Sequence, residues 1–143
     1  MRIRDVLAAK ADPTVLTVPP DLSVRDLLAR LAEHNVGALV VSSDGAAVEG
    51  IVSERDVVRH LNGNPEVLSA EVRTIMTTEV HSCPLDADLD ELMTAMTQRR
   101  IRHVPVLDGE RMVGIVSIGD VVKHKISSLQ FERDQLDSYV HQT

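Results

Sequence analysis

The sequence predicts an α+β fold in which a β-α-β-β-α unit occurs twice and a helical extension follows. The first observation behind this prediction is a repeated motif: GIVSERDVVRH at residues 50–60 returns as GIVSIGDVVKH at residues 114–124. The second is a helical pattern of apolar residues before each copy, and the third is an Asp-Gly turn between two apolar runs in each copy. Because units of about 60 residues bury too little surface alone, we expect the two units to form one module.

The first helix of each unit is predicted by apolar residues at i, i+3, i+4 and i+7, the spacing that lines one face of a helix. An offset of 65 residues carries the first set onto the second: Val24, Leu27, Leu28 and Leu31 correspond to Leu89, Leu92, Met93 and Met96. Ser23 and Asp88 precede these helices, and the acidic residue three positions later fits the capping-box pattern. We expect the two apolar helix faces to form the interface between the units.

A β-hairpin is predicted after each of these helices. The apolar runs VGALVV (36–41) and IRHVPV (101–106) are each followed by an Asp-Gly pair and then by a second apolar run. Two β-rich runs joined at an Asp-Gly turn are typical of a hairpin. The Ser of each repeated motif then begins a second helix, so each unit is expected to contain a strand, a helix, two strands and a helix.

The joint between the units is predicted around NGNPE, where Asn and Gly favour a helix end and Pro prevents its continuation. We therefore expect the first repeat over residues 1–64, the second over 65–126 and a helical tail over 127–143. The two repeats are expected to be related by a pseudo-twofold axis and to form one globular module.

The composition excludes several classes of protein. The 143 residues carry a formal net charge of -7, which argues against binding to DNA or RNA, since that affinity requires clustered Lys and Arg. A single cysteine, Cys83, cannot form an internal disulfide and is typical of a reducing compartment. No apolar run approaches the roughly 18 residues of a membrane span, so we expect no membrane association and a cytoplasmic location.

The repeated features resemble a tandem pair of cystathionine-β-synthase (CBS) domains. The resemblance rests on GIVS-x-x-D at the end of each unit and on the entries TVPPDLSV and SCPLDADL before the first helices, and it covers roughly residues 1–126. It implies a regulatory module without catalytic activity. It also implies an adenosine-containing ligand in clefts between the units: AMP foremost, with ATP or NAD(H) as other candidates.

The ribose of such a ligand is expected to meet the Ser and Asp of each motif: Ser53, Asp56, Ser117 and Asp120. A ribose presents two adjacent hydroxyls, and a carboxylate can accept a hydrogen bond from both. The N-terminus of a helix also favours the charge of a nearby phosphate. The alternative is that each Ser-Asp pair only caps its helix, because the three-residue spacing is that of a capping box. Gly50 and Gly114 permit close backbone approach or mark a β-bulge.

The phosphate is expected to contact Arg102 and His103, which the resemblance places at the start of the second unit's central strand. The first unit has Gly and Ala at the equivalent positions, so we expect unequal clefts with the phosphate contacts beside Asp120. The alternative, that Arg102 serves the other cleft, stays open because the pseudo-twofold axis brings both central strands near the centre. His103 should strengthen phosphate binding as it protonates below its reference pKa of about 6.5. We interpret Arg99 and Arg100 as complements of a helix C-terminus and Arg55 as a solvated charge.

The adenine pocket is assigned from the resemblance to small and aliphatic residues near the entry strands and the Gly-containing strands. The assigned residues are Leu16, Val36, Ile51, Ile115 and His81. Each of the aliphatic residues also suits an ordinary core, and His81 also suits a surface position without a role.

Neither a catalytic triad nor a zinc site is expected, although some residues suggest one. Ser53, Asp56 and His60 lie along one short helix, which is not the converging geometry of a nucleophile and its base. No H-x-x-x-H or C-x-x-C spacing occurs, so no zinc site is predicted.

The tail, residues 127–143, continues the apolar pattern of the preceding helix. Its spacing of four and three residues is typical of a short coiled-coil seam, interrupted by Arg133. We expect a homodimer that this seam forms or stabilises, and an effector protein that receives the signal. Two alternatives remain open at this point: the tail folds back onto its own unit, or the whole chain is a structural adaptor that dimerises without a ligand.

Overall fold

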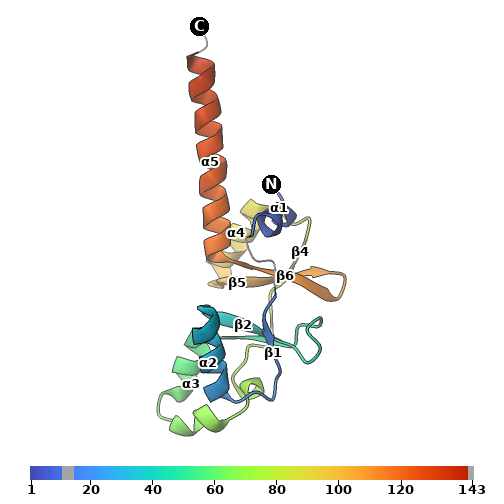
Figure 1. The fold of residues 1–143 in the computed structure, drawn as a ribbon, viewed down its shortest axis with the longest axis vertical. Helices are drawn as coiled ribbons and strands as arrows, with labels where there is room; N and C mark the ends of the chain where they lie inside the picture. The colour runs from blue at the N-terminus through green and yellow to red at the C-terminus, as the bar shows by residue number, and fades with distance from the viewer. Residues whose placement is uncertain (11–14, 142–143) are drawn as a thin grey trace.

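The structure is a computed structural model that describes residues 1–10 and 15–141. Two units lie one above the other along the long axis, and a long helix extends from the second unit away from the first (Figure 1). Each unit contains one three-stranded sheet with helices packed against it. The predicted α+β class with a C-terminal helical extension is confirmed.

The first unit contains the predicted order of strand, helix, strand, strand and helix. Its elements are β1 (Thr17–Val18), α2 (Val24–His34), β2 (Ala38–Val41), β3 (Gly50–Ser53) and α3 (Glu54–Leu61). In the sheet, β2 is central, parallel to β1 and antiparallel to β3. Two short 3-10 helices follow, η1 (Pro65–Ser69) and η2 (Val72–Thr74), and the chain then crosses to the second unit.

The second unit repeats this order and the same sheet topology. Its elements are β4 (Cys83–Pro84), α4 (Leu89–Arg99), β5 (His103–Asp108), β6 (Arg111–Ser117) and α5 (Ile118–Val140). The central strand β5 is parallel to β4 and antiparallel to β6, with a register shift between Val106 and Leu107. The two central strands begin and end near the predicted runs, so hairpin formation after the first helix of each unit is confirmed.

The N-terminal helix α1 (Ile3–Ala8) packs on the second unit rather than on the first. Ile3 is fully buried there, and its backbone N–H donates to the Ala87 carbonyl at 3.0 Å. In return, Val67 and Val72, which follow the first repeat, are buried in the core of the first unit. The packing of the two cores therefore crosses the expected sequence boundary between residues 64 and 65.

The apolar faces of α2 and α4 fill the cores of their own units. Val24, Leu27 and Leu31 lie in the first core, and Leu89, Leu92 and Met96 lie in the second. The expectation that these faces form the interface between the units is therefore wrong. The physical reason is that each three-stranded sheet has an apolar face of its own, and the amphipathic helix of the same unit covers it.

The N-caps of both helices form as predicted, each with one bond of a capping box. Ser23 Oγ accepts a hydrogen bond from the Asp26 N–H at 3.1 Å, and Asp88 Oδ2 accepts one from the Glu91 N–H at 3.2 Å.

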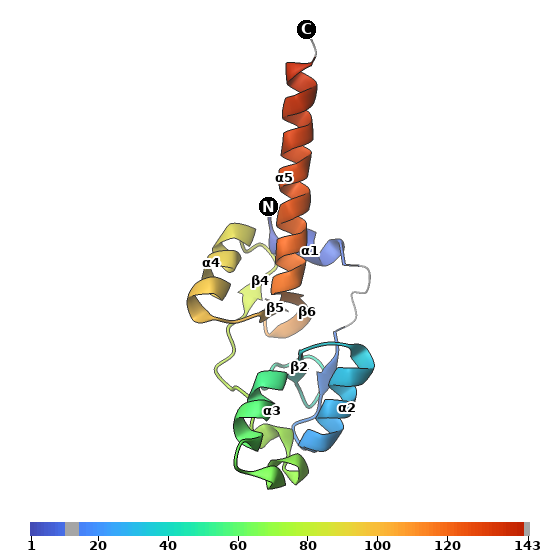
Figure 2. The same cartoon turned by 90° about the vertical axis from the view of Figure 1, so that its left-hand side faces the viewer.

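The second helix of the second unit and the tail form one continuous helix, α5, of 23 residues. Its first turns pack against α4, α1 and β6. The remainder stands clear of both units in two perpendicular views (Figures 1 and 2). The alternative in which the tail folds back onto its own unit is therefore wrong.

Gly50 and Gly114 are positions where another segment of the same chain approaches the backbone. A Cβ on Gly50 would lie 2.9 Å from the Thr77 carbonyl oxygen and 2.7 Å from Met76 Sδ, whereas a Cβ on Gly114 would lie 2.8 Å from Leu7 Cδ2. The Thr77 N–H donates to the Ile51 carbonyl at 2.9 Å. This hydrogen bond holds the linker between the units, residues 75–82, against β3. The close approach expected at these glycines is thus made by the linker and by α1.

We expect Gly50→Ala to destabilise the protein by roughly 1–3 kcal/mol, because the new methyl group meets a hydrogen-bonded backbone that must move. Gly114→Ala is the matched control, since the flexible Leu7 side chain can turn away, and its cost should be smaller. Urea unfolding of both variants measures the difference. If both variants lose the same stability, the backbone at Thr77 moves as easily as the Leu7 side chain does, and the expected difference is wrong.

Candidate functional site

Two clefts lie between the units, and each contains the Asp of one repeated motif. We name them the Asp56 cleft, of about 500 Å³, and the Asp120 cleft, of about 480 Å³. Both volumes lie within the range of roughly 300–1,000 Å³ that small-molecule sites occupy. Each cleft combines the Asp of one unit with the segment that joins the first helix to the central strand of the other unit.

All the residues assigned to the ligand from the sequence line one of these clefts. The Asp56 cleft receives Ser53, Asp56, Ile51, His81, Arg102 and His103. The Asp120 cleft receives Ser117, Asp120, Leu16, Val36, Ile115 and again His103. His103, the first residue of β5, is thus the one assigned residue shared between the two clefts, together with Gly37 and Ala38, which sequence reasoning did not assign.

Ser53 and Asp56 form a complete capping box at the start of α3. The Ser53 N–H donates to Asp56 Oδ2 at 2.9 Å, and the Asp56 N–H donates to Ser53 Oγ at 3.3 Å. Ser53 Oγ also lies 3.1 Å from the same Oδ2. Among the described residues, Asp56 Oδ1 has no hydrogen-bond partner, and Asp56 lines the cleft.

Ser117 and Asp120 form the equivalent box at the start of α5, with an additional cation. The Ser117 N–H donates to Asp120 Oδ2 at 2.9 Å, and Lys10 Nζ lies 3.1 Å from the same oxygen. Lys10 Nζ also donates to the Ile115 carbonyl at 2.9 Å. Burial alone would raise the pKa of Asp120, but the hydrogen bonds from Ser117 and the Lys10 ammonium outweigh it and lower the pKa. The carboxylate is therefore charged at neutral pH.

Lys10 is the functional candidate that sequence reasoning missed. It lies just beyond α1, outside both repeated motifs, and it reaches Asp120 because α1 packs on the second unit. A single Lys between α1 and β1 belongs to no repeated motif and to no periodic pattern of the sequence. Its place in the Asp120 cleft could therefore be found only from the structure.

The structure places Arg102 in the other cleft from the one expected. Arg102 lines the Asp56 cleft and not the Asp120 cleft. The reason lies in how the units pair: the segment between α4 and β5 faces the Asp of the other unit rather than that of its own. Arg102 therefore lies in the cleft of Asp56, whereas phosphate binding in either cleft stays a prediction.

Five arginines gather in the Asp56 cleft: Arg55, Arg59, Arg99, Arg100 and Arg102. Three carboxylates share the cleft, those of Glu54, Asp56 and Glu79. Arg55, Arg99 and Arg100 are exposed, and Arg99 lies in the last turn of α4, so the interpretations of these three residues as a solvated charge and as helix-end complements stay compatible with the structure. Arg100 has φ 55°, a left-handed conformation that a non-Gly residue adopts at some cost, and the equivalent Asn35 has φ 52° in the other cleft.

His103 titrates lower than sequence reasoning assumed. Burial lowers its pKa below the ordinary 6.5, Asp120 partly opposes the shift, and Arg102 and Lys10 reinforce it. The imidazole is therefore neutral at neutral pH. The expected strengthening of phosphate binding by a protonated His103 stays a prediction, and it now applies to more acidic conditions than pH 6.5.

The patterns that suggested catalysis or metal binding do not converge. His60 Nδ1 lies 2.8 Å from the Asp56 backbone carbonyl, an interaction within α3, and His60 makes no hydrogen bond to Ser53 among the described residues. Cys83 is buried, and burial raises the pKa of its thiol to about 11, so it is not a thiolate nucleophile at neutral pH. Within residues 1–10 and 15–141, no three His, Cys, Asp or Glu side chains gather as a metal site.

The two units share one sheet topology, and each contributes a capping box to a cleft, so the chain is a tandem-repeat module with two candidate binding sites. The chain belongs to the CBS-domain family: the CBS domain profile matches residues 3–63 and 72–127, one match for each unit. The resemblance drawn from the repeated motifs is therefore confirmed.

Relatives and solved structures agree with this membership. The CBS-domain protein ATU1752 of Agrobacterium tumefaciens is 41% identical, with a TM-score of 0.82 over 87% of this chain and 99% of that one. The mitochondrial CBS domain-containing protein CBSX3 of Arabidopsis thaliana is 37% identical over 96% of this chain and 71% of its own length. The CBS pair of protein MJ0100, 25% identical with a TM-score of 0.77 over 90% of this chain and 98% of that one, was solved in complex with 5'-methylthioadenosine and S-adenosyl-L-methionine.

No helix among the described residues combines the length and the apolar character that a membrane crossing requires. The cytoplasmic location stays a prediction, and one of the relatives carries a mitochondrial name.

Proposed function

We propose that this chain is a non-catalytic sensor of adenosine-containing nucleotides, which bind in the Asp56 and Asp120 clefts. The observation that carries the proposal is the repeated capping box in each cleft, which positions a carboxyl group in the first turn of a helix. The ligands of the MJ0100 pair, both of which contain adenosine, support the same class of ligand here. AMP, ATP and NAD(H) are the candidates.

The ribose diol is proposed to bind the carboxylate in each cleft. In both boxes the Ser N–H occupies Oδ2, and Oδ1 is the oxygen left for a hydroxyl. The aliphatic residues assigned to the adenine, such as Ile51 in one cleft and Ile115 in the other, line the same spaces. A flat apolar base and a polar sugar would thus each meet a matching surface.

The phosphates are proposed to distinguish the clefts. Five arginines line the Asp56 cleft, which suits a di- or triphosphate, because guanidinium groups bind phosphate oxygens in pairs. In the Asp120 cleft Lys10 already neutralises the carboxylate, which suits a nucleoside or a monophosphate. ATP is therefore assigned to the Asp56 cleft, and AMP or a nucleoside to the Asp120 cleft.

A purely structural adaptor is the second candidate. It is favoured by the completeness of both capping boxes, since capping alone explains why each motif contains Ser and Asp. On either candidate, we propose that the chain acts as a homodimer and passes its state to an effector protein.

The test is calorimetric titration of the parent chain with ATP, AMP and adenosine. We expect ATP to bind more tightly than adenosine, and Arg102→Ala to reduce this preference about threefold to tenfold by removing one phosphate contact. Arg111→Ala is the matched control, because Arg111 is exposed on β6 and lines neither cleft. Absence of binding by all three compounds would leave the adaptor as the function.

A further inference from the structure

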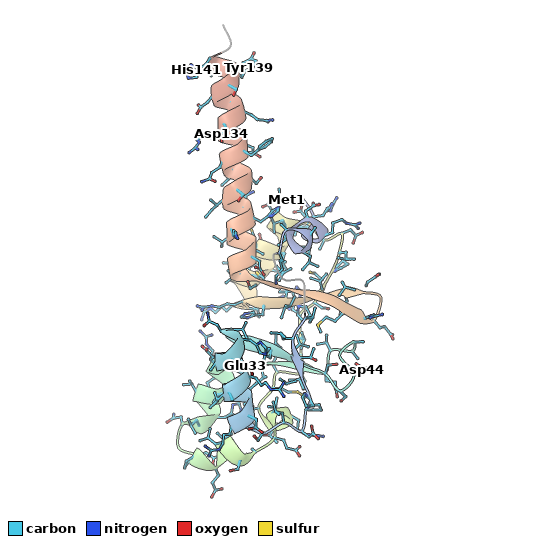
Figure 3. All side chains as sticks on the ribbon, viewed as in Figure 1. Met1, Glu33, Asp44, Asp134, Tyr139 and His141 are labelled. Atoms are coloured by element: carbon cyan, nitrogen blue, oxygen red, sulfur yellow. The ribbon has the colours of Figure 1, made fainter. Side chains whose placement is uncertain are left out.

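The projecting part of α5 has an apolar stripe that the described chain leaves uncovered. The stripe, which we name the α5 seam, consists of Val122, Ile126, Leu129, Leu136 and Val140, with Arg133 in its interior. Its apolar members are between 42% and 66% exposed. The seam spans about 27 Å, at 1.5 Å per residue. Figure 3 shows Asp134, Tyr139 and His141 near the free end of α5, where no other element of the chain lies beside the helix.

The base of the seam is accessible as well as its tip. Val121 is buried against the second unit, while the next residue, Val122, is 42% exposed. Lys125 faces the unit and pairs with Asp90 of α4 at 3.1 Å. Since successive helical residues are about 100° apart, the seam lies to the side of the face that packs on the unit, and its apolar members are exposed from Val122 to Val140.

We propose that two copies of this chain pair through the α5 seam with their helices antiparallel. This inference specifies the homodimer included in the proposed function and does not depend on nucleotide binding. The seam residues alternate in spacing between four and three, as the a and d positions of a coiled coil do. The d positions are Val122, Leu129 and Leu136. The a positions are Ile126, Arg133 and Val140. When the second helix runs in the opposite direction and the two helices cross at residue 131, every a position faces a d position of the other copy. Val122 then faces Val140, for example.

The charges along α5 determine the direction of pairing. In the antiparallel arrangement Lys123 lies beside Asp137 of the second copy, and the symmetry repeats this pair. Neither side chain makes an ion pair with another described residue of its own chain, and both are exposed. The one like-charge contact is Glu132 with its copy, beside the two Arg133 guanidiniums.

A parallel arrangement sets like charges together. The flanking positions would then bring Glu132 beside Asp137 of the second copy, twice. The two Arg133 side chains would also share one layer of the seam. In the antiparallel arrangement each Arg133 instead faces a Leu129, along which its aliphatic stem can pack while the guanidinium reaches water.

The first experiment measures the mass of the full chain, without nucleotide, by sedimentation over micromolar to hundred-micromolar concentrations. We expect the parent to be a dimer and Leu136→Glu to be a monomer. Phe131→Ala is the matched control: Phe131 is 63% exposed on another face of α5, and its loss should leave the dimer intact. A monomeric parent, or a Leu136→Glu variant with the mass and dissociation constant of the parent, overturns the proposal.

The second experiment tests direction by exchanging charges. Asp137→Lys should raise the dimer dissociation constant about tenfold in the antiparallel arrangement, and the double variant with Lys123→Glu should restore it. In a parallel arrangement the same Asp137→Lys change would tighten the dimer, by pairing with Glu132, and this result overturns the proposed direction. Calorimetry with ATP on the same samples separates the two hypotheses, because loss of the dimer need not remove nucleotide binding.

Discussion

Asp56→Ala should weaken ATP binding about ten- to a hundredfold, because hydrogen bonds to a charged group contribute roughly 1.5–3 kcal/mol. The lost contact is the proposed one between the ribose and Oδ1. The same substitution removes the carboxylate that accepts the Ser53 N–H, so a loss of stability on the order of 1 kcal/mol should accompany it. Calorimetry measures the affinity, and urea unfolding measures the stability.

Asp120→Ala is the matched control for Asp56→Ala, since it breaks the same capping box in the other cleft. It should cost at least as much stability, because Lys10 also loses its ion-pair partner, and it should leave tight ATP binding in place. If Asp120→Ala removes the tight ATP site and Asp56→Ala retains it, the arginines of the Asp56 cleft do not select the polyphosphate. If both variants bind ATP like the parent and only melt earlier, the two carboxylates are caps and not ribose ligands.

Leu27→Ala should destabilise the protein by roughly 2.7–5 kcal/mol, the range observed when a fully buried leucine is truncated. Leu27 is 0% exposed at the centre of the first core, where α2 covers the sheet. The melting temperature should fall by roughly 10 °C.

Leu28→Ala is the control at the neighbouring position, because Leu28 is 36% exposed. Its cost should stay at or below about 1 kcal/mol. This pair of variants also tests the corrected packing: had α2 formed the interface between the units, truncation of Leu27 would separate the units rather than melt one core. Differential scanning calorimetry distinguishes these results.

The repeated elements could be predicted from the sequence because their signals are local. The spacing of Val24, Leu27 and Leu31 identifies α2, and Ser53 with Asp56 identifies the start of α3. Each of these patterns spans only one or two turns of a single helix, so it can be recognised without knowing how distant segments pack. Once the order of elements is known for one copy, the second copy supplies an independent check of the same order.

The partners of each cleft could not be predicted, because they depend on how distant segments meet. Arg102 was assigned to its own unit's Asp, whereas it faces Asp56 of the other unit. Lys10 reaches Asp120 across 110 positions of chain only because α1 packs on the second unit. The core faces of α2 and α4 were recognised, but periodicity does not state which surface an apolar face meets.

The exchange of core segments described above makes the two halves of the chain mutually dependent. A cut between residues 64 and 65 would give one fragment that carries α1 without its binding site, and another that carries Val67 and Val72 away from the first core. Neither fragment would hold a complete interior. Such fragments should fold when mixed rather than alone, as in complementation of a split protein.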